Sequence, residues 1–148
     1  MSKRWGTPTW YFLHTLIEKL DSNYYKMISS SVTNIIVDLF GNLPCPYCKD
    51  HALQYIKKKN IYKIKTKEEM KEYLFHFHNN VSKRIKNNTQ GKEILDLYKK
   101  MNFYKVFKYF EVQFFYSSPL NRSFIGWRSS FKNRLITFLN KHRHKIYK

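Results

Sequence analysis

The sequence contains only two cysteines in 148 residues, too few for a fold held together by disulfides. No run of about 18 apolar residues occurs, which is the length that a membrane-spanning helix needs. The first ten residues also lack the apolar stretch of a secretory signal peptide, and internal repeats and low-complexity segments are absent. These absences lead us to expect a soluble protein that is not secreted and has no membrane span.

Acidic residues are scarce as well: ten stand against 28 lysines and arginines, which gives a formal net charge of +18. Such a charge attracts polyanions, either a nucleic acid backbone or the phosphates of a cofactor. A lysine-rich composition is also typical of AT-rich genomes, so the charge alone identifies no partner. The hydrophobic fraction of 43%, with 18% aromatic residues, excludes a disordered chain and indicates a single folded domain at this length.

Apolar residues recur at helical spacing along residues 1–101, and no alternating run of strand length competes with them there. Thr7 as N-cap and Pro8 at the first helical position predict the start of an amphipathic helix that reaches Leu20. A second apolar series ends at Gly41, a residue that commonly closes helices. These signals predict the first two helices.

Three further helices are expected in the same region. One runs from residue 47 to about 59, with Cys45 at or just before its first turn. The run TKEE at residues 66–69 matches a capping box, and the helix behind it extends to Ile85. A short fifth helix covers about residues 92–101. The sequence therefore predicts an all-α fold, a bundle of four helices plus one.

Residues 102–148 form a basic extension rich in aromatic residues. Its first part, NFYKVFKYFEVQFFY, fits a helix or a strand, and we interpret it as a helix. The run SSP at residues 117–119 interrupts this segment, and a basic amphipathic helix is expected after it. We therefore divide the chain into a core, residues 1–101, and an extension, residues 102–148, that is packed on the core or tethered to it.

Both cysteines lie in the stretch LPCPYCKDH, at the start of the third predicted helix. The unpaired amides and the dipole at a helix N-terminus stabilise a thiolate, so Cys45 and Cys48 suit disulfide exchange. A zinc site would need two more ligands, and the nearby candidates are His51, His76 and His78. The last two lie two residues apart in a helix and point about 200° apart, which is a poor arrangement for one ion. The residues favour redox chemistry, and zinc binding and inert buried thiols remain alternatives.

A thioredoxin-type fold would supply strands before and after the motif helix, and the sequence shows no such strands. An all-helical protein with a redox dithiol must pass two electrons to another acceptor. A bound cofactor is the natural acceptor.

Three segments resemble, in order and spacing, the FAD-linked sulfhydryl oxidases of the Erv/ALR type. They are WGTPTWYFLHTL (residues 5–16), LPCPYCKDHA (43–52) and FHFHNNVSKRI (75–85). The resemblance covers about residues 4–101, and it is closest to the compact versions encoded by large cytoplasmic DNA viruses. It implies a four-helix bundle with a short fifth helix that together cradle FAD. This fold agrees with the helix count reached from the residues.

The resemblance also implies a role for each cysteine. Cys45 would be the exposed member, which a substrate dithiol attacks in the Cys45–Cys48 disulfide. Cys48 would lie against the isoalloxazine ring of FAD and reduce it, and oxygen would reoxidise the flavin to give hydrogen peroxide. The activity implied is that of a thiol oxidase, and no metal ligand is implied.

The residues expected to contact FAD come from the same resemblance. Trp10 and His14 lie four residues apart on one helix face and would line the flavin and the adenine, although both are also ordinary core residue types. Gly6 allows close approach of the backbone or is simply part of the turn. Tyr98 would lie near the adenine or in the core. His51 lies one helical turn after Cys48 and would approach that sulfur or the flavin edge.

A second group of expected contacts matches the H-N-x-V-N block that wraps the adenosine in this family: His78, Asn79, Val81 and Ser82. Ser82 replaces the usual asparagine, and its hydroxyl reaches less far than an amide. Arg84 would neutralise the pyrophosphate, with Lys83 and Lys86 as alternatives.

Further expectations concern partners and location. Because no other cysteine pair is present, a substrate must meet Cys45 directly, and the partner would be a dithiol protein or a thioredoxin-like carrier. Oxygen would be the electron acceptor. The family commonly dimerises through the first two helices, so we expect a noncovalent homodimer. A protein that makes disulfides would serve a virus in the host cytoplasm, at the viral factory, because the host keeps thiols reduced there. The virion is a further expected location.

Two other functions compete with this interpretation. One is a basic helical nucleic-acid-binding protein, because aromatic residues alternate with lysine and arginine in NFYKVFKYF and FKNRLITFLNKHRHK. The other is a zinc-bound interaction module. Absence of flavin absorbance would favour either one.

Overall fold

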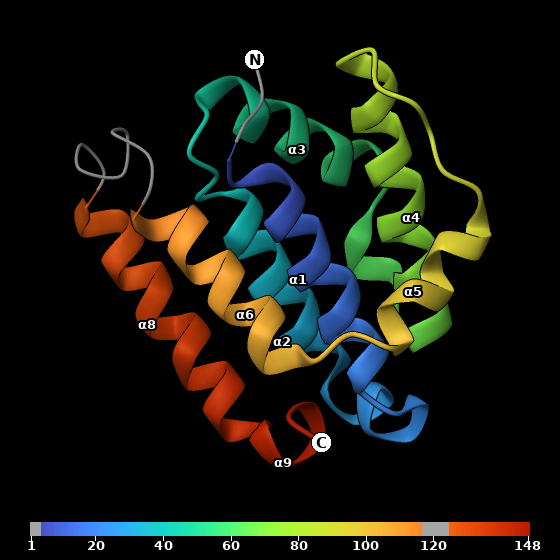
Figure 1. The fold of residues 1–148 in the computed structure, drawn as a ribbon, viewed down its shortest axis with the longest axis vertical. Coiled ribbons are helices and arrows are strands. Elements are labelled where there is room, and N and C mark those ends of the chain that lie inside the picture. The colour runs from blue at the N-terminus through green and yellow to red at the C-terminus, as the bar shows by residue number, and fades with distance from the viewer. Residues whose placement is uncertain (1–3, 117–124) are drawn as a thin grey trace.

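The computed structural model describes residues 4–116 and 125–148 (Figure 1). These residues form eight α-helices, two short 3₁₀ helices and one π-helical turn, and none of them forms a β-strand. The all-α prediction is confirmed. In chain order the elements are α1 (Gly6–Lys19), α2 (Ser22–Phe40), α3 (Pro46–Lys58), η1 (Ile61–Lys63), α4 (Lys67–Arg84), η2 (Lys92–Ile94), α5 (Leu95–Lys99), α6 (Phe103–Glu111), η3 (Val112–Tyr116), α8 (Ile125–Lys141) and α9 (Arg143–Ile146).

Local signals in the sequence set most of the helix ends. Thr66 and Glu69 form the predicted capping box: the Glu69 N–H donates to the Thr66 hydroxyl, and the Glu69 carboxylate accepts from the Thr66 N–H. Gly41 is the C-cap of α2, as predicted. Asp21 caps the start of the same helix by accepting from the N–H of Tyr24 at 2.8 Å.

The predicted start of α1 is wrong. The N-cap residue is Trp5 rather than Thr7, and the helix begins at Gly6. The reason is that the carbonyl of Trp5 accepts both the backbone N–H and the hydroxyl of Thr9, so the first turn closes two residues earlier than expected. Pro8 then occupies the third helical position, where its missing N–H has no partner to lose.

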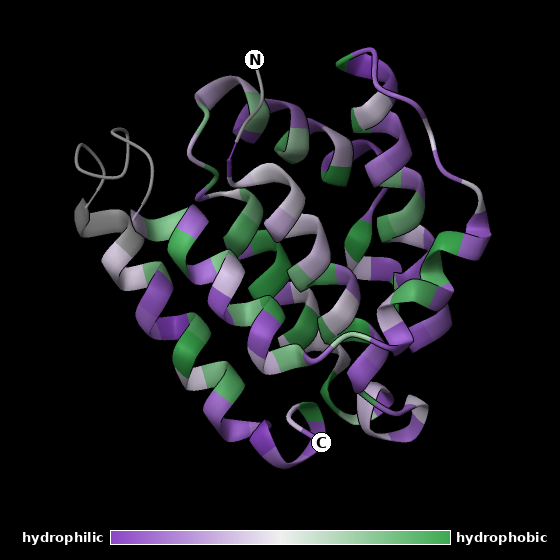
Figure 2. Cartoon of the chain, viewed as in Figure 1, coloured by the Kyte–Doolittle hydropathy of each residue, from purple (hydrophilic) through white to green (hydrophobic). Residues whose placement is uncertain are grey.

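Helix α1 lies in the middle of the molecule (Figure 1). It packs against α6 on one side and against α4 and α5 on the other, while α2 packs against α3, α4 and α8. Hydrophobic residues gather where α1, α2 and α6 face one another, and the connection between α4 and α5 is mainly hydrophilic (Figure 2). Helices α4 and α5 are therefore on the opposite side of α1 from α6, and α3 lies across the top of the view, packed on α2 (Figure 1).

The extension shares the apolar core with the first four helices. Phe12 of α1 contacts three phenylalanines of α6, with ring centroids 5.9 Å from Phe103, 5.8 Å from Phe107 and 4.4 Å from Phe110. Phe131 of α8 is fully buried in the same cluster. The prediction that the segment NFYKVFKYFEVQFFY is helical is confirmed by α6 and η3.

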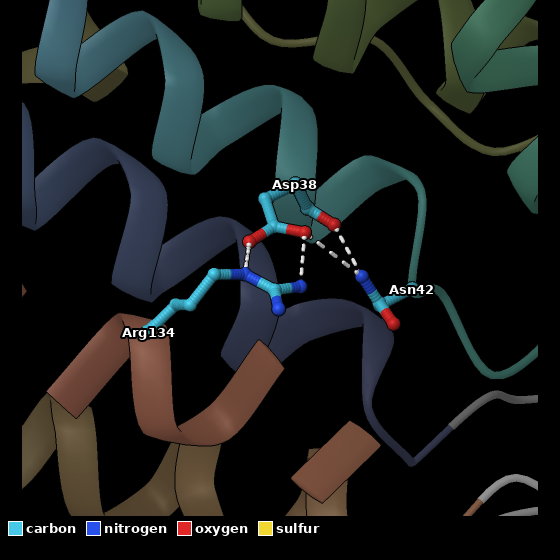
Figure 3. Close-up of polar contacts among 3 residues, drawn as sticks. All are labelled: Asp38, Asn42 and Arg134. Atoms are coloured by element: carbon cyan, nitrogen blue, oxygen red, sulfur yellow. Dashed lines mark hydrogen bonds and ion pairs between the residues drawn. The ribbon is translucent and has the colours of Figure 1, made fainter. Parts of the chain in front are cut away.

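An ion pair also joins the extension to α2 (Figure 3). The guanidinium of Arg134 in α8 donates two hydrogen bonds to the carboxylate of Asp38, at 2.6 Å and 2.9 Å. The side-chain amide of Asn42 donates to the backbone carbonyl and the carboxylate of the same aspartate. The predicted interruption at residues 117–119 lies outside the described residues. Among the residues that are described, no helix is long and apolar enough to cross a membrane.

Candidate active site

The two cysteines lie at the start of α3. Cys45 is the N-cap residue, and its Sγ accepts a hydrogen bond from the N–H of Cys48 at 3.2 Å. Pro46 occupies the first helical position, which suits its fixed φ and its lack of an N–H. Because the first amides of a helix point toward its N-cap, the Sγ of Cys45 lies where a backbone N–H can donate to it. Both cysteines are thiols and both are half-buried, so the predicted contrast between an exposed Cys45 and a covered Cys48 stays a prediction.

Four of the residues expected to contact FAD form one ring cluster, contributed by three helices. His78 of α4 lies flat on Trp10 of α1, with centroids 4.2 Å apart and planes 8° apart. Tyr98 of α5 stacks on His14 of α1, at 4.5 Å and 15°. The two histidines meet between these pairs, with His14 Nε2 3.4 Å from His78 Nδ1. The structure therefore brings together residues that the sequence predicted as a set.

The histidines of this ring cluster are held neutral. Burial, and then the nearby His78, lower the pKa of His14 from 6.5 to about 3. Burial lowers the pKa of His78 from 6.5 to about 4. Burial of Tyr98, and then the nearby Tyr11, raise the pKa of the Tyr98 phenol to about 12. The cluster thus presents uncharged rings and uncharged hydrogen-bonding nitrogens at neutral pH.

Phe77 connects the ring cluster to the helix of the redox motif. Its ring meets Trp10 edge-on at 5.5 Å and His51 edge-on at 6.0 Å. It also stacks on Tyr55 of α3 at 4.3 Å. Phe77 was not singled out from the sequence. The signal available was its place inside the block FHFHNN, next to His78.

The end of α4 carries the other predicted adenosine contacts. The side chain of Asn79 exchanges two hydrogen bonds with the backbone of Gln90, both at 2.9 Å, and so ties the α4–α5 connection to the helix. Ser82 is buried, and Val81 is half-buried against the core. Gly6 is the first residue of α1. The assignment of these residues to FAD stays a prediction.

Two hydrogen-bonded pairs join the first turns of α3 to the last turns of α4. Arg84 donates from Nε and Nη2 to the phenol oxygen of Tyr47, at 2.9 Å and 2.5 Å, and its guanidinium lies 4.7 Å from the centre of that ring. One turn after Tyr47 in α3 and one turn before Arg84 in α4, His51 Nε2 lies 3.0 Å from Asn80 Oδ1. Arg84, the predicted pyrophosphate ligand, is thus bound to Tyr47, the second of the two residues between the cysteines. Tyr47 and Asn80 were not singled out from the sequence.

Residues of these two pairs also affect the pKa of His51. Burial, and then the positive charge of Arg84, lower the pKa of His51 below its usual value. The hydrogen bond with Asn80 opposes this shift. Within residues 4–116 and 125–148, no three His, Cys, Asp or Glu side chains are grouped so that they could hold a metal ion.

A known protein family matches more than half of this chain. The model of the Erv1 / Alr family matches residues 7–103, which is more than half of the chain and includes the redox motif and every ring of the cluster. The chain belongs to the Erv1 / Alr family. The expected family is thereby confirmed. No significant match to a solved structure was found.

Members of the Erv1 / Alr family from viruses and from a plant are similar in sequence. Protein 096R of Invertebrate iridescent virus 3 is 29% identical over 84 residues, which are 56% of this chain and 57% of that protein. The FAD-linked sulfhydryl oxidase of an African swine fever virus isolate is 33% identical over 82 residues, 55% of this chain and 67% of that protein. The FAD-linked sulfhydryl oxidase ERV1 of Arabidopsis thaliana is 30% identical over 80 residues, 54% of this chain and 41% of that protein. The chain thus matches only part of each relative.

Proposed function

We propose that this chain is an FAD-dependent thiol oxidase, which forms disulfides in protein substrates and reduces oxygen to hydrogen peroxide. One observation carries the proposal: the cysteine pair opens a helix whose next turn reaches the ring cluster through Phe77. Ring contacts from His51 through Phe77 to Trp10 thus connect the helix of the redox dithiol to the uncharged rings, which supports the proposal. The names of the African swine fever virus and Arabidopsis relatives support it.

The residues present fit FAD. Flat rings of the cluster suit stacking against the isoalloxazine and adenine rings, and neutral histidine nitrogens can donate to or accept from their polar edges. Lys83 and Lys86, which are exposed around the end of α4, suit a pyrophosphate. We assign Trp10, His14, His78 and Tyr98 to the FAD rings, and Gly6, His51, Asn79, Val81 and Ser82 to the periphery of the cofactor. Arg84 is left out of this set because its guanidinium is bound to Tyr47.

The chemistry of the chain itself is thiol exchange. A substrate thiolate attacks Cys45 Sγ in the Cys45–Cys48 disulfide, which forms a substrate–Cys45 disulfide and releases Cys48 as a thiolate. The second substrate thiolate then displaces Cys45, so the substrate leaves as a disulfide and the pair keeps two electrons. The N–H of Cys48 is placed to donate to the Cys45 sulfur released in this step. FAD, when bound, supplies the two-electron acceptor that restores the pair to a disulfide and passes the electrons to oxygen.

The partners belong to the same proposal. A dithiol protein or a thioredoxin-like carrier would be the substrate, and the host cytoplasm, with its viral factory, would be the location. The noncovalent homodimer stays a prediction. Because α6 and α8 pack on α1 and α2, such a dimer would have to use a surface other than the one these helices cover.

The nucleic-acid alternative has less support. In the segment NFYKVFKYF the phenylalanines are buried in the core, and only tyrosines such as Tyr104 and Tyr109 remain exposed among the lysines. Most of the rings that a base could stack on are therefore taken up by packing.

The test is an absorption spectrum combined with an oxidation assay. Purified protein reconstituted with FAD should show a visible flavin band, and it should oxidise dithiothreitol with consumption of oxygen. Cys45→Ser and Cys48→Ser should each reduce this oxidation to background, whereas Ser30→Ala, an exposed position on α2, should not. A protein that takes up no FAD, or a Cys48→Ser variant that oxidises as fast as the wild type, contradicts the proposal.

A further inference from the structure

The hydrogen bonds between Arg84 and Tyr47 are unusual in their chemistry. Two N–H groups on one edge of the guanidinium, Nε and Nη2, converge on a single neutral oxygen. That edge is spaced to bind two oxygens at once, and its best partners are carboxylates and phosphates. A neutral phenol oxygen is therefore a weaker acceptor at this edge than a carboxylate or a phosphate would be.

The location of this edge is equally specific. Tyr47 is the second residue between the two cysteines, and 61% of its surface is exposed. Arg84 is exposed as well, and its guanidinium lies over the Tyr47 ring. The guanidinium thus lies on an exposed residue of the motif, two positions after Cys45 in the chain. The pair forms part of the surface that a substrate meets.

The charge around the motif is almost entirely positive. Residues 39–67, which contain the motif, include only one acidic residue, Asp50. Residues 73–92, which contain the end of α4, include none, and Lys83 and Lys86 are exposed next to Arg84. The charge of Arg84 is also felt at His51, one turn after Cys48. Such a surface attracts an acidic segment and repels a basic one.

We propose that Arg84 is a docking residue that selects dithiol substrates with an aspartate or glutamate beside the cysteines, and that Tyr47 holds its guanidinium in place until the carboxylate displaces the phenol oxygen. This inference rests on the proposed thiol oxidase function and names the substrate class of that site. It gives Arg84 a different role from the predicted pyrophosphate contact, and the two roles have different consequences.

Binding is tested first, with a readout that needs no catalysis. The probe is a fluorescein-labelled peptide in which serines replace both cysteines of a C-x-x-C dithiol, flanked either by glutamates or by glutamines. Fluorescence anisotropy with the FAD-reconstituted protein should give about tenfold tighter binding of the glutamate peptide, which corresponds to about 1.4 kcal/mol. Arg84→Gln should remove this preference, and raising the ionic strength should weaken it.

Three further variants separate charge from geometry. Arg84→Lys keeps the positive charge but lacks the two N–H donors on one edge of the guanidinium. It should lose most of the preference for the glutamate peptide. Tyr47→Phe removes the competing oxygen and keeps the ring beneath the guanidinium, so the glutamate peptide should bind at least as tightly as to the wild type. Lys58→Gln removes the same charge about 16 Å along α3 from Tyr47 and should change nothing.

Catalysis provides the second readout. With dithiol versions of the two peptides, Arg84→Gln should raise KM for the glutamate peptide about tenfold and leave the oxidation of dithiothreitol within twofold. Equal binding of the two peptides to the wild type overturns the inference. So does a loss of FAD and of dithiothreitol oxidation in Arg84→Gln, which would return this residue to the pyrophosphate. Failure of the wild type to oxidise dithiothreitol refutes the thiol oxidase function instead, and leaves the anisotropy result to decide the docking role.

Discussion

Lowering the pH from 7 to 5 should destabilise the fold through the two neutral histidines of the ring cluster. In the unfolded chain both titrate near 6.5, whereas in the folded protein the pKa of His14 is about 3 and the pKa of His78 is about 4. Between these values the unfolded chain binds two protons that the folded protein does not. The free energy of unfolding therefore falls as the pH falls below 6.5.

The size of this loss of stability follows from the difference between the pH and the histidine pKa in the unfolded chain. At pH 5, which is 1.5 units below 6.5, each histidine costs about 2 kcal/mol at about 1.36 kcal/mol per unit. The pair thus removes about 4 kcal/mol, a large part of the roughly 5–15 kcal/mol that holds a domain of this kind together. The contact between the histidines acts in the same direction, because a proton on one opposes a proton on the other.

Urea unfolding followed by tryptophan fluorescence at pH 7, 6 and 5, at constant ionic strength, measures this loss. The protein must be free of FAD, since a ligand that binds only the folded state adds its own pH dependence. His78→Gln removes one of the two titrations and should halve the loss to about 2 kcal/mol. His76→Gln, at an exposed position on the same helix, should leave it at about 4 kcal/mol. The reasoning is refuted if the wild type loses less than about 1 kcal/mol, or if His78→Gln loses as much as the wild type.

Two further predictions compare packing with ion pairing in the extension. Phe110→Ala should cost about 3–5 kcal/mol in urea unfolding, because this ring is fully buried against Phe12, and a loss below about 1 kcal/mol would mean that the extension is only tethered. Arg134→Gln should cost no more than about 1 kcal/mol, because the guanidinium that binds Asp38 is more than half exposed and water screens the pair; a loss as large as that of Phe110→Ala would contradict this ranking.

Much of this protein could be predicted from short stretches of the sequence. The apolar spacing indicated the helices, the capping box marked the start of α4, and the position of Cys45 ahead of a helix was correctly inferred. These features depend on residues within one or two turns of each other, so the local sequence contains the information. The resemblance of three segments to the family then predicted that Trp10, His14, His78 and Tyr98 belong to one site.

Only the tertiary structure decided which distant side chains meet. Phe77 has the pattern of a core residue, and nothing local shows that its ring contacts both Trp10 and His51. Arg84 has the charge of a phosphate ligand, and only the packing of α3 on α4 places it on Tyr47. The physical reason is that a helix pattern sets the face on which a side chain lies, while the partner it meets depends on how the helices pack.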